Sequence, residues 1–325
     1  MAPALLQLPP YLALASAAAV LGAPAAEAAT GRAGQLRIAV SGGGIVEQTA
    51  SAVGIWANSP NVEISVVNES PGFYNGTLKW RNVPAGSYLI SGRGVAEAAT
   101  NTAGSLVASL SLAGGGRSRW RLEPNLSKDY RFAVSGTVKS GLGALPESAA
   151  QRPHFAVQLG GMGVVPAMSL AETLDFPSYL LPGVNDSSPA IRQRLGASYQ
   201  AFGVGADRFL LLDNRNYSLG TKQLEWVGKR LQDFRLEGAR QVFVFMHRPP
   251  VDPRRNVRNG LANKAEARRL ARLLKTVRTA AIFSGQVNRS YTRNWHGFKT
   301  YMLAGRDVMV VETRGGELSV RLAIH

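Results

Sequence analysis

The sequence predicts two domains of different class, an N-terminal all-β sandwich and a C-terminal α/β domain. Between Gln35 and Leu112, short alternating runs are separated by Gly, Asn, Ser and Pro turns, with almost no helical period. After about residue 130, apolar runs of strand length alternate with amphipathic helical patterns, which is typical of a sheet covered by helices. The length of 325 residues is sufficient for two hydrophobic cores.

Residues 1–28 are expected to be a signal peptide. An Ala- and Leu-rich segment is interrupted by Pro24 and ends in Ala26-Glu27-Ala28, the small-x-small form that a signal peptidase cleaves. The alternative is a membrane anchor, but the apolar run is shorter than the ~20 residues of a spanning helix and no basic cluster follows it. We therefore expect a secreted or periplasmic chain that begins near Ala29 and has no transmembrane segment.

Residues 32–115 are expected to form the sandwich, with LRIAV, VEISVV, TLKW, SYLISG and LVASLSL as strands. The second half of this region resembles the bacterial immunoglobulin-like modules of exported proteins. This resemblance is carried by Trp80, Pro84, Gly86, Tyr88 and Gly104. Such residues are structural, so the resemblance implies a fold and no chemistry. The basic, Gly-rich residues 116–129 are interpreted as a linker.

In residues 130–325 the expected strands are RFAVSG, HFAVQLGG, RFLLLD, QVFVFMH, AAIFSG, DVMVVE and LSVRLA. The two clearest helical patterns are TKQLEWVGKRLQDF and ANKAEARRLARLLKTV. At the second helix, Asn263 is expected to cap the N-terminus and Glu266 to complete a capping box. Its period places Leu270, Leu273, Leu274 and Val277 in the core and Arg268, Arg269, Arg272 and Lys275 in solvent.

The net charge of +16 is concentrated in one segment. Residues 240–299 contain 14 basic and 2 acidic side chains, a net charge of +12. A basic helix face is usually a solvated surface, but a field of this size also attracts anions. Nucleic acid is disfavoured as a partner because no recognised module or aromatic stacking series accompanies the charge. The absence of cysteine excludes thiolate metal sites and a cysteine nucleophile.

Ligands of open α/β sheets bind beyond the carboxyl ends of the strands. The residues at these positions are Ser135-Gly136-Thr137, Gly160-Gly161-Met162, Gly183-Val184-Asn185-Asp186, His247-Arg248-Pro249-Pro250 and Gly285-Gln286-Val287-Asn288. Their order, with FPSYLLPGVND and VFVFMHRPP, resembles the calcineurin-like metallophosphoesterase superfamily over residues 130–325. The resemblance implies an αββα sandwich with a site for two divalent metals.

Position by position, the family's ligands are missing. The first Asp and His align with Gly136 and Val138, and the metal-bridging Asp aligns with Gly161. The Asn ligand and the catalytic His align with Val184 and Asn185. The last two His align with Gln286 and Asn288, so that only His247 is kept. The resemblance therefore implies a degenerate site without a metal cofactor, where the amides would keep the hydrogen bonds of the turn.

Several alternatives remain open at this site. His247 is either a packed relic or an active group, and His247 with Asp186 and Asp213 would be the only candidate single-metal set. Turn capping also explains both aspartates. Arg248 and Arg289 each follow a former ligand position and are candidates, with Arg268, Arg269 and Arg272, for binding an anion.

Two functions from different classes are therefore considered. The first is an exported, catalytically inactive phosphoesterase-like protein that binds or scaffolds an anionic polymer or protein of the cell envelope. The second is a metal-dependent phosphoesterase with a reduced or altered metal site, which would require two divalent metals. The missing ligands favour the first.

Overall fold

The computed structural model describes residues 28–91, 94–96, 104–126, 129–137, 148–252, 254 and 259–323. The signal peptide expected over residues 1–28 lies, except for its last residue, outside the described part of the chain. Within that part, no helix has the length and apolar character needed to cross a bilayer.

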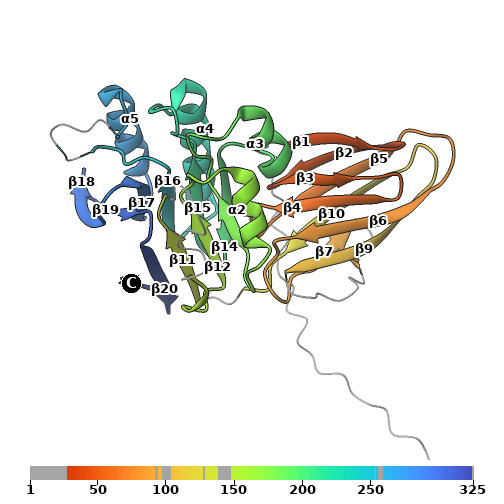
Figure 1. Ribbon diagram of the computed structural model, residues 1–325, viewed down its shortest axis with the longest axis horizontal. Coiled ribbons are helices and arrows are strands. Elements are labelled where there is room, and N and C mark those ends of the chain that lie inside the picture. Colours follow the sequence, from red (N-terminus) through yellow and green to blue (C-terminus); the bar gives the residue numbers. More distant parts are fainter. Residues whose placement is uncertain are drawn as a thin grey trace, which may run out of the picture.

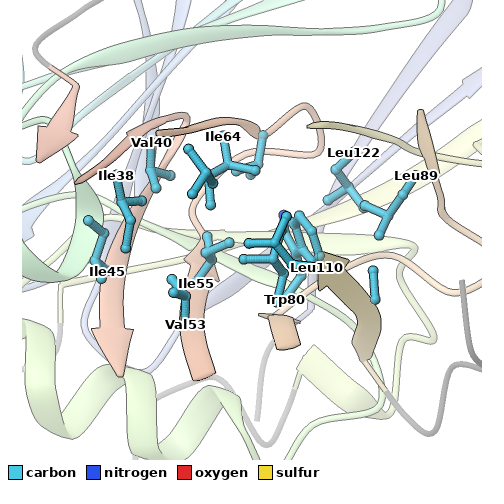
Figure 2. Close-up of a cluster of buried hydrophobic side chains, with 14 of the residues drawn as sticks. Ile38, Val40, Ile45, Val53, Ile55, Ile64, Trp80, Leu89, Leu110 and Leu122 are labelled. Atoms are coloured by element: carbon cyan, nitrogen blue, oxygen red, sulfur yellow. The ribbon is translucent and has the colours of Figure 1, made fainter. Parts of the chain in front are cut away.

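The N-terminal region consists of two β-sheets that share one core. One sheet has the strand order β1-β2-β5-β10-β7-β8 and the other has the order β3-β4-β6-β9. Ile38, Ile64 and Leu122 from the first sheet meet Ile55 and Trp80 from the second (Figure 2). The strands are β1 (Ala29–Ala33), β2 (Leu36–Ser41), β3 (Gly43–Gln48), β4 (Ala52–Ala57), β5 (Glu63–Asn68), β6 (Tyr74–Arg81), β7 (Tyr88–Ser91), β8 (Gly94–Ala96), β9 (Ser105–Leu112) and β10 (Arg117–Glu123).

The linker predicted over residues 116–129 is wrong for half of its length. Residues 117–123 form β10, which pairs with β5 and β7 inside the first sheet. Arg117, Arg119 and Arg121 are exposed, whereas Leu122 is fully buried and Trp120 packs against the core. The alternation that marks a strand is therefore present, but its arginine-rich outer face looks like a linker in the sequence.

The C-terminal region is a second pair of stacked sheets with helices outside. The sheet orders are β13-β12-β11-β20-β21 and β14-β15-β16-β17-β19-β18. The elements are β11 (Tyr130–Ser135), β12 (Phe155–Gln158), α2 (Val164–Ala171), β13 (Ser178–Leu180), α3 (Ser188–Leu195), β14 (Gln200–Val204), β15 (Asp207–Leu212), α4 (Gly220–Leu236), β16 (Gln241–Met246), α5 (Lys264–Leu274), β17 (Thr279–Val287), β18 (Tyr291–Trp295), β19 (Phe298–Ala304), β20 (Val308–Arg314) and β21 (Glu317–Ala323).

Side chains that alternate along the inner strands point into two different hydrophobic cores. Phe132, Phe155, Phe209 and Phe245 lie between the two sheets, where the rings of Phe132 and Phe155 stack at 5.3 Å. The other face of the six-stranded sheet packs against α4 and α5, and α2 packs beside the five-stranded sheet. The expected αββα layering is therefore present (Figure 1).

The cap of α5 is correct only in part. The Asn263 side chain accepts a hydrogen bond from the Ala265 N–H at 2.8 Å, as expected. Glu266 does not complete a capping box, because its carboxylate accepts from the Ser218 hydroxyl and from the Leu219 N–H, at 2.8 and 3.0 Å. Glu266 therefore ties α5 to the start of α4, a tertiary contact that competes with the local one.

The two regions meet along β13, the edge strand of the five-stranded sheet. Asn58 pairs with both the N–H and the C=O of Leu180, at 2.7 and 3.1 Å. Asn82 pairs in the same way with Ser178, at 2.8 and 2.9 Å. Trp56 is buried against α2 and α3 beside these pairs. Two side-chain amides thus occupy the place of a neighbouring strand.

Candidate functional site

The turns selected from the sequence converge at one end of the C-terminal sandwich. The His247 ring, after β16, contacts the Leu159 carbonyl oxygen, after β12, at 2.7 Å. The Gln286 N–H, near the end of β17, donates to the Thr137 hydroxyl, after β11, at 3.0 Å. The carboxyl ends of both sheets therefore lie together, as the fold requires.

Gly136 has no space for a side chain. A Cβ atom there would lie 1.9 Å from the Ala304 carbonyl oxygen, and the Gly136 N–H donates to the Asp307 carbonyl at 3.1 Å. The backbone at Gly136 is thus packed directly against the end of β19 and the turn that follows it. A carboxylate at this position would require the backbone to move.

Gly161, which the resemblance aligns with the family's bridging carboxylate, has a backbone φ of 119°. Side chains other than glycine rarely adopt such a conformation. The neighbouring Gly183 approaches closely, since a Cβ there would lie 2.4 Å from the Gly161 nitrogen. The turn is therefore built from glycine backbone and offers no acidic side chain.

His247 is fully buried and neutral at pH 7. Its Nδ1 must carry the proton, because the group it contacts is the carbonyl oxygen of Leu159. Burial lowers the pKa of His247 to about 4, against the opposing effect of this hydrogen bond. Nε2 is buried and has no hydrogen-bond partner in the described structure, so the ring keeps one free acceptor.

Thr137 is a central residue that sequence reasoning did not single out. Its hydroxyl donates to the Leu159 carbonyl at 3.2 Å and accepts from Gln286 N–H. It also faces Gly285, where a Cβ would lie 2.0 Å from the Thr137 hydroxyl oxygen. The only sequence signal was its place directly after Gly136. Its hydroxyl now joins the ends of β11, β12 and β17.

The amides at positions 185, 286 and 288 behave differently from one another. The Asn185 side chain donates to the Gly161 carbonyl at 3.0 Å and holds that turn, whereas the side-chain hydrogen bonds of the turn were expected from Gln286 and Asn288. At Gln286 the backbone makes the contacts instead, with its carbonyl accepting from Asn259 at 3.0 Å, and its φ is 60°. Asn288 is exposed, and so is Val184.

The candidate single-metal set of His247, Asp186 and Asp213 is not assembled. The Asp186 carboxylate accepts from the Val164 and Gly183 N–H groups, at 2.6 and 2.7 Å, which is the predicted turn-capping role. Burial raises the pKa of Asp213, and Arg215 opposes this, at 3.6 Å from the carboxylate. Among the described residues, no group of three or more His, Asp or Glu side chains is arranged to hold a metal ion.

Two divalent metals, which the family resemblance implies for an active site, do not fit these residues. The first motif lacks space for a ligand at Gly136, and Gly161 provides no bridging carboxylate. His247 would be the one imidazole facing them, since Gln286 and Asn288 carry amides. No reaction step through a metal can be built on this arrangement.

Arg248 does not face an open cleft, contrary to expectation. It is buried, its Nε donates to the Arg215 carbonyl at 2.9 Å, and its guanidinium lies 3.6 Å from the centre of the Tyr217 ring. The Asn214 side chain donates to the Arg248 carbonyl at 2.8 Å and accepts from the Arg248 N–H at 3.0 Å. Burial lowers the pKa of Arg248, and no carboxylate pairs with it within the described residues.

The other candidate arginines are on the surface. Arg289 is exposed beside the former ligand turn, and Arg268 and Arg272 are exposed on α5, with Arg269 half-buried. None of the four has an ion pair with another residue of the described ranges. The helix α5 lies toward the end of the molecule opposite the N-terminal sheets (Figure 1).

In fold, the chain is similar to the purple acid phosphatase PPD1 from yellow lupin (Lupinus luteus) seeds. The TM-score is 0.51 and the identity 8%, over 81% of this chain and 69% of that one. A dimetal phosphatase from Danio rerio has a TM-score of 0.49 and an identity of 12%, over 59% of this chain and 95% of that one. GAP50 of Plasmodium has a TM-score of 0.48 and an identity of 16%, over 60% of this chain and 84% of that one. No family model and no curated protein matches the sequence.

The match to the lupin enzyme defines the class of fold. The C-terminal region has a metallophosphoesterase-like fold, in agreement with the motif order in the sequence. Because it covers 81% of the chain, the match also extends beyond residues 130–325 into the N-terminal sheets. At 8% identity it establishes the fold alone and says nothing of activity.

Proposed function

We propose that this protein is a catalytically inactive, metallophosphoesterase-like binding protein for an anionic partner. The observation that carries the proposal is the packing of Gly136 against the Ala304 carbonyl, which leaves no space for a metal-binding carboxylate. A dinuclear hydrolase needs that carboxylate and the one at Gly161 to hold the metals that polarise phosphate and generate hydroxide. The neutral, carbonyl-bound His247 cannot replace them.

The test of inactivity is metal content and turnover. The full chain, purified with Mn, Fe and Zn supplied, is expected to contain well under one metal per chain and to hydrolyse neither a phosphomonoester nor a phosphodiester. The matched variant is His247→Ala, which should change neither result. Stoichiometric metal, together with turnover that His247→Ala abolishes, would show that the chain is an enzyme.

The basic face of α5 supports the anionic partner. Arg268, Arg269 and Arg272 form no ion pair among the described residues, so their charges are available to a polyanion. Salt weakens such an attraction, because the screening length falls from ~10 Å at 0.1 M to ~3 Å at 1 M salt. Replacing all three arginines with Gln removes part of the attraction, so the protein should elute from a polyanionic column at a lower salt concentration.

A matched control removes the same charge elsewhere. Arg117, Arg119 and Arg121 are exposed on β10, in the sandwich at the other end of the molecule (Figure 1). Changing these three to Gln should shift elution less than the α5 substitutions. Equal shifts would mean that net charge alone, and no particular surface, determines retention.

We also propose that the chain is exported and that its N-terminal sheets form an immunoglobulin-like module. The Ala26-Glu27-Ala28 segment supports export, and N-terminal sequencing that finds Met1 on a cytosolic protein would contradict it. The buried Trp80 and the positive φ of Gly86 and Gly104 support the module. An experimental strand order unlike that of solved immunoglobulin-like domains would contradict this assignment.

A further inference from the structure

Four exposed apolar side chains surround the carboxyl ends of the strands. Val165 follows the β12 turn, Val184 the end of β13, Tyr217 the end of β15 and Val251 the end of β16, with exposed fractions of 49%, 45%, 39% and 47%. We call these four residues the carboxyl-end rim. Single exposed apolar residues are ordinary on a protein surface, whereas several on adjoining turns are not.

Direct contacts connect the turns that carry the rim. The Val164 N–H donates to Asp186 at 2.6 Å, which joins the turns of Val165 and Val184. Arg215 donates to the Ser188 hydroxyl at 3.1 Å, which joins the Val184 turn to the one before Tyr217. The Arg248 guanidinium on the Tyr217 ring then connects to the turn of Val251. The four turns that carry the rim are thus joined to one another.

Of the charged side chains beside the rim, some already have partners in the protein and others do not. Asp186 is occupied by two backbone N–H groups, and Asp252 is paired with Arg254 at 2.8 Å. Asp213 is half-buried beside Arg215. Arg289, in contrast, is exposed and has no carboxylate partner among the described residues, and the buried Arg248 has none either. The uncompensated charge at this end is positive.

We propose that the carboxyl-end rim binds a protein segment in which an acidic residue stands beside large apolar ones. Apolar rim residues would bury apolar side chains, the Tyr217–Arg248 stack offers a rigid aromatic contact, and Arg289 pairs with the acidic group. A polyphosphate or polysaccharide would leave the valines without partners. This inference rests on the proposed function, since it names a protein as the anionic partner at the former metal site.

The experiment is a selection of displayed random peptides on the immobilised full chain, followed by affinity measurement of the best peptide in solution. Enriched peptides are expected to combine Asp or Glu with Leu, Ile, Phe or Trp. In the Val184→Ser/Val251→Ser variant the affinity should fall about tenfold or more, because two apolar contacts are lost. Arg289→Gln should weaken binding of the same peptide. When the Asp or Glu of that peptide is replaced with Asn or Gln, Arg289→Gln should no longer change the affinity.

Two controls separate this inference from the rest. Phe73→Ser/Leu236→Ser removes two exposed apolar residues outside the rim and should leave the affinity unchanged. The α5 triple Gln variant should keep peptide affinity while losing polyanion retention. The inference is overturned if no acidic and apolar peptides are enriched, if the rim variant binds them as well as the native chain, or if polyphosphate alone binds with the same dependence on the rim. Phosphate-ester turnover in the native chain would instead overturn the proposed function.

Discussion

Amide side chains occupy two contrasting places in this molecule. At the interface between the regions, Asn58 and Asn82 are almost fully buried, and each joins both the N–H and the C=O of one residue of β13. At the carboxyl ends of the strands, Asn185 makes one bond to a turn, Gln286 uses its backbone, and Asn288 is exposed.

The contrast shows that burial and geometry decide what an amide does. An amide carries a donor and an acceptor side by side, so it can replace the adjoining strand of a sheet edge. In a buried interface each unmade bond is costly, and the pairing is therefore structural. At the strand ends, solvent satisfies what the protein does not. Those amides therefore take no common role at the strand ends.

The largest effect is expected from removing both interface amides. In Asn58→Ala/Asn82→Ala, four buried backbone groups of β13 lose their partners, which should cost about 5 kcal/mol of unfolding free energy. Chemical denaturation of the full chain measures this. The matched control is Asn185→Ala, which loses one part-exposed hydrogen bond and should cost about 1 kcal/mol or less. Similar losses in both variants would remove the distinction between the two places.

The next effect tests how tightly the backbone at Gly136 is packed. Gly136→Ala places a Cβ against the Ala304 carbonyl and should cost about 3 kcal/mol, because the backbone must shift. Gly72→Ala, where the nearest atom would be 4.0 Å away, serves as the control and should cost under about 0.5 kcal/mol. A Gly136→Ala protein of native stability would show that the site can open to accept a side chain.

The pH dependence of stability should report the buried His247. Its pKa of about 4 in the folded state lies below the ordinary ~6.5, so the unfolded chain binds a proton first as the pH falls. Stability is therefore complete above pH ~6.5, is lost toward pH 4, and should be lower by about 2 kcal/mol at pH 5.

The control is His247→Gln, which keeps a donor for the Leu159 carbonyl and does not titrate. Its stability should change less between pH 7 and pH 5 than that of the native chain, as measured by denaturation at each pH. Parallel pH profiles would show that His247 is not the buried neutral group described here.

The smallest effect concerns Gln286. Its φ of 60° is unfavourable for a side chain, and its hydrogen bonds with Asn259 and Thr137 are made by the backbone, so Gln286→Gly should stabilise the fold by about 0.5 kcal/mol. Thermal unfolding compares this variant with Gln286→Ala, which keeps the strained φ and should gain nothing. A destabilised Gln286→Gly would mean that the amide side chain itself holds the turn.

Much of the fold follows from periodicity in the sequence. The runs RFAVSG, QVFVFMH and AAIFSG become β11, β16 and β17, and the leucine stripe of α5 is buried at Leu270 and Leu274. Periodicity and apolar content are local properties of the chain, so they can be read from the sequence without the packing partners in the fold. The strand β10 was missed because three arginines hide an alternation that only the partner strands β5 and β7 make decisive.

The candidate site likewise has features that the sequence predicted and features that it did not. The sequence identified the turns at the strand ends and the residue types in them, because residue identity at a strand end needs no coordinates. It misplaced Arg248, whose charge suggested an anion but whose burial under Tyr217 makes it structural. It also missed Thr137, because a hydroxyl acquires its role only from the groups it meets.

By itself, then, the sequence determined the succession of a β region and an α/β region, the residue types at the strand ends and the basic character of α5. Tertiary structure decided that the Gly136 position is closed by the Ala304 carbonyl, that Glu266 binds α4 instead of its own helix, and that two asparagines close the edge of β13. The reason is physical. Composition and period are encoded in neighbouring residues, whereas close packing and hydrogen-bond partners come from residues far apart in the chain.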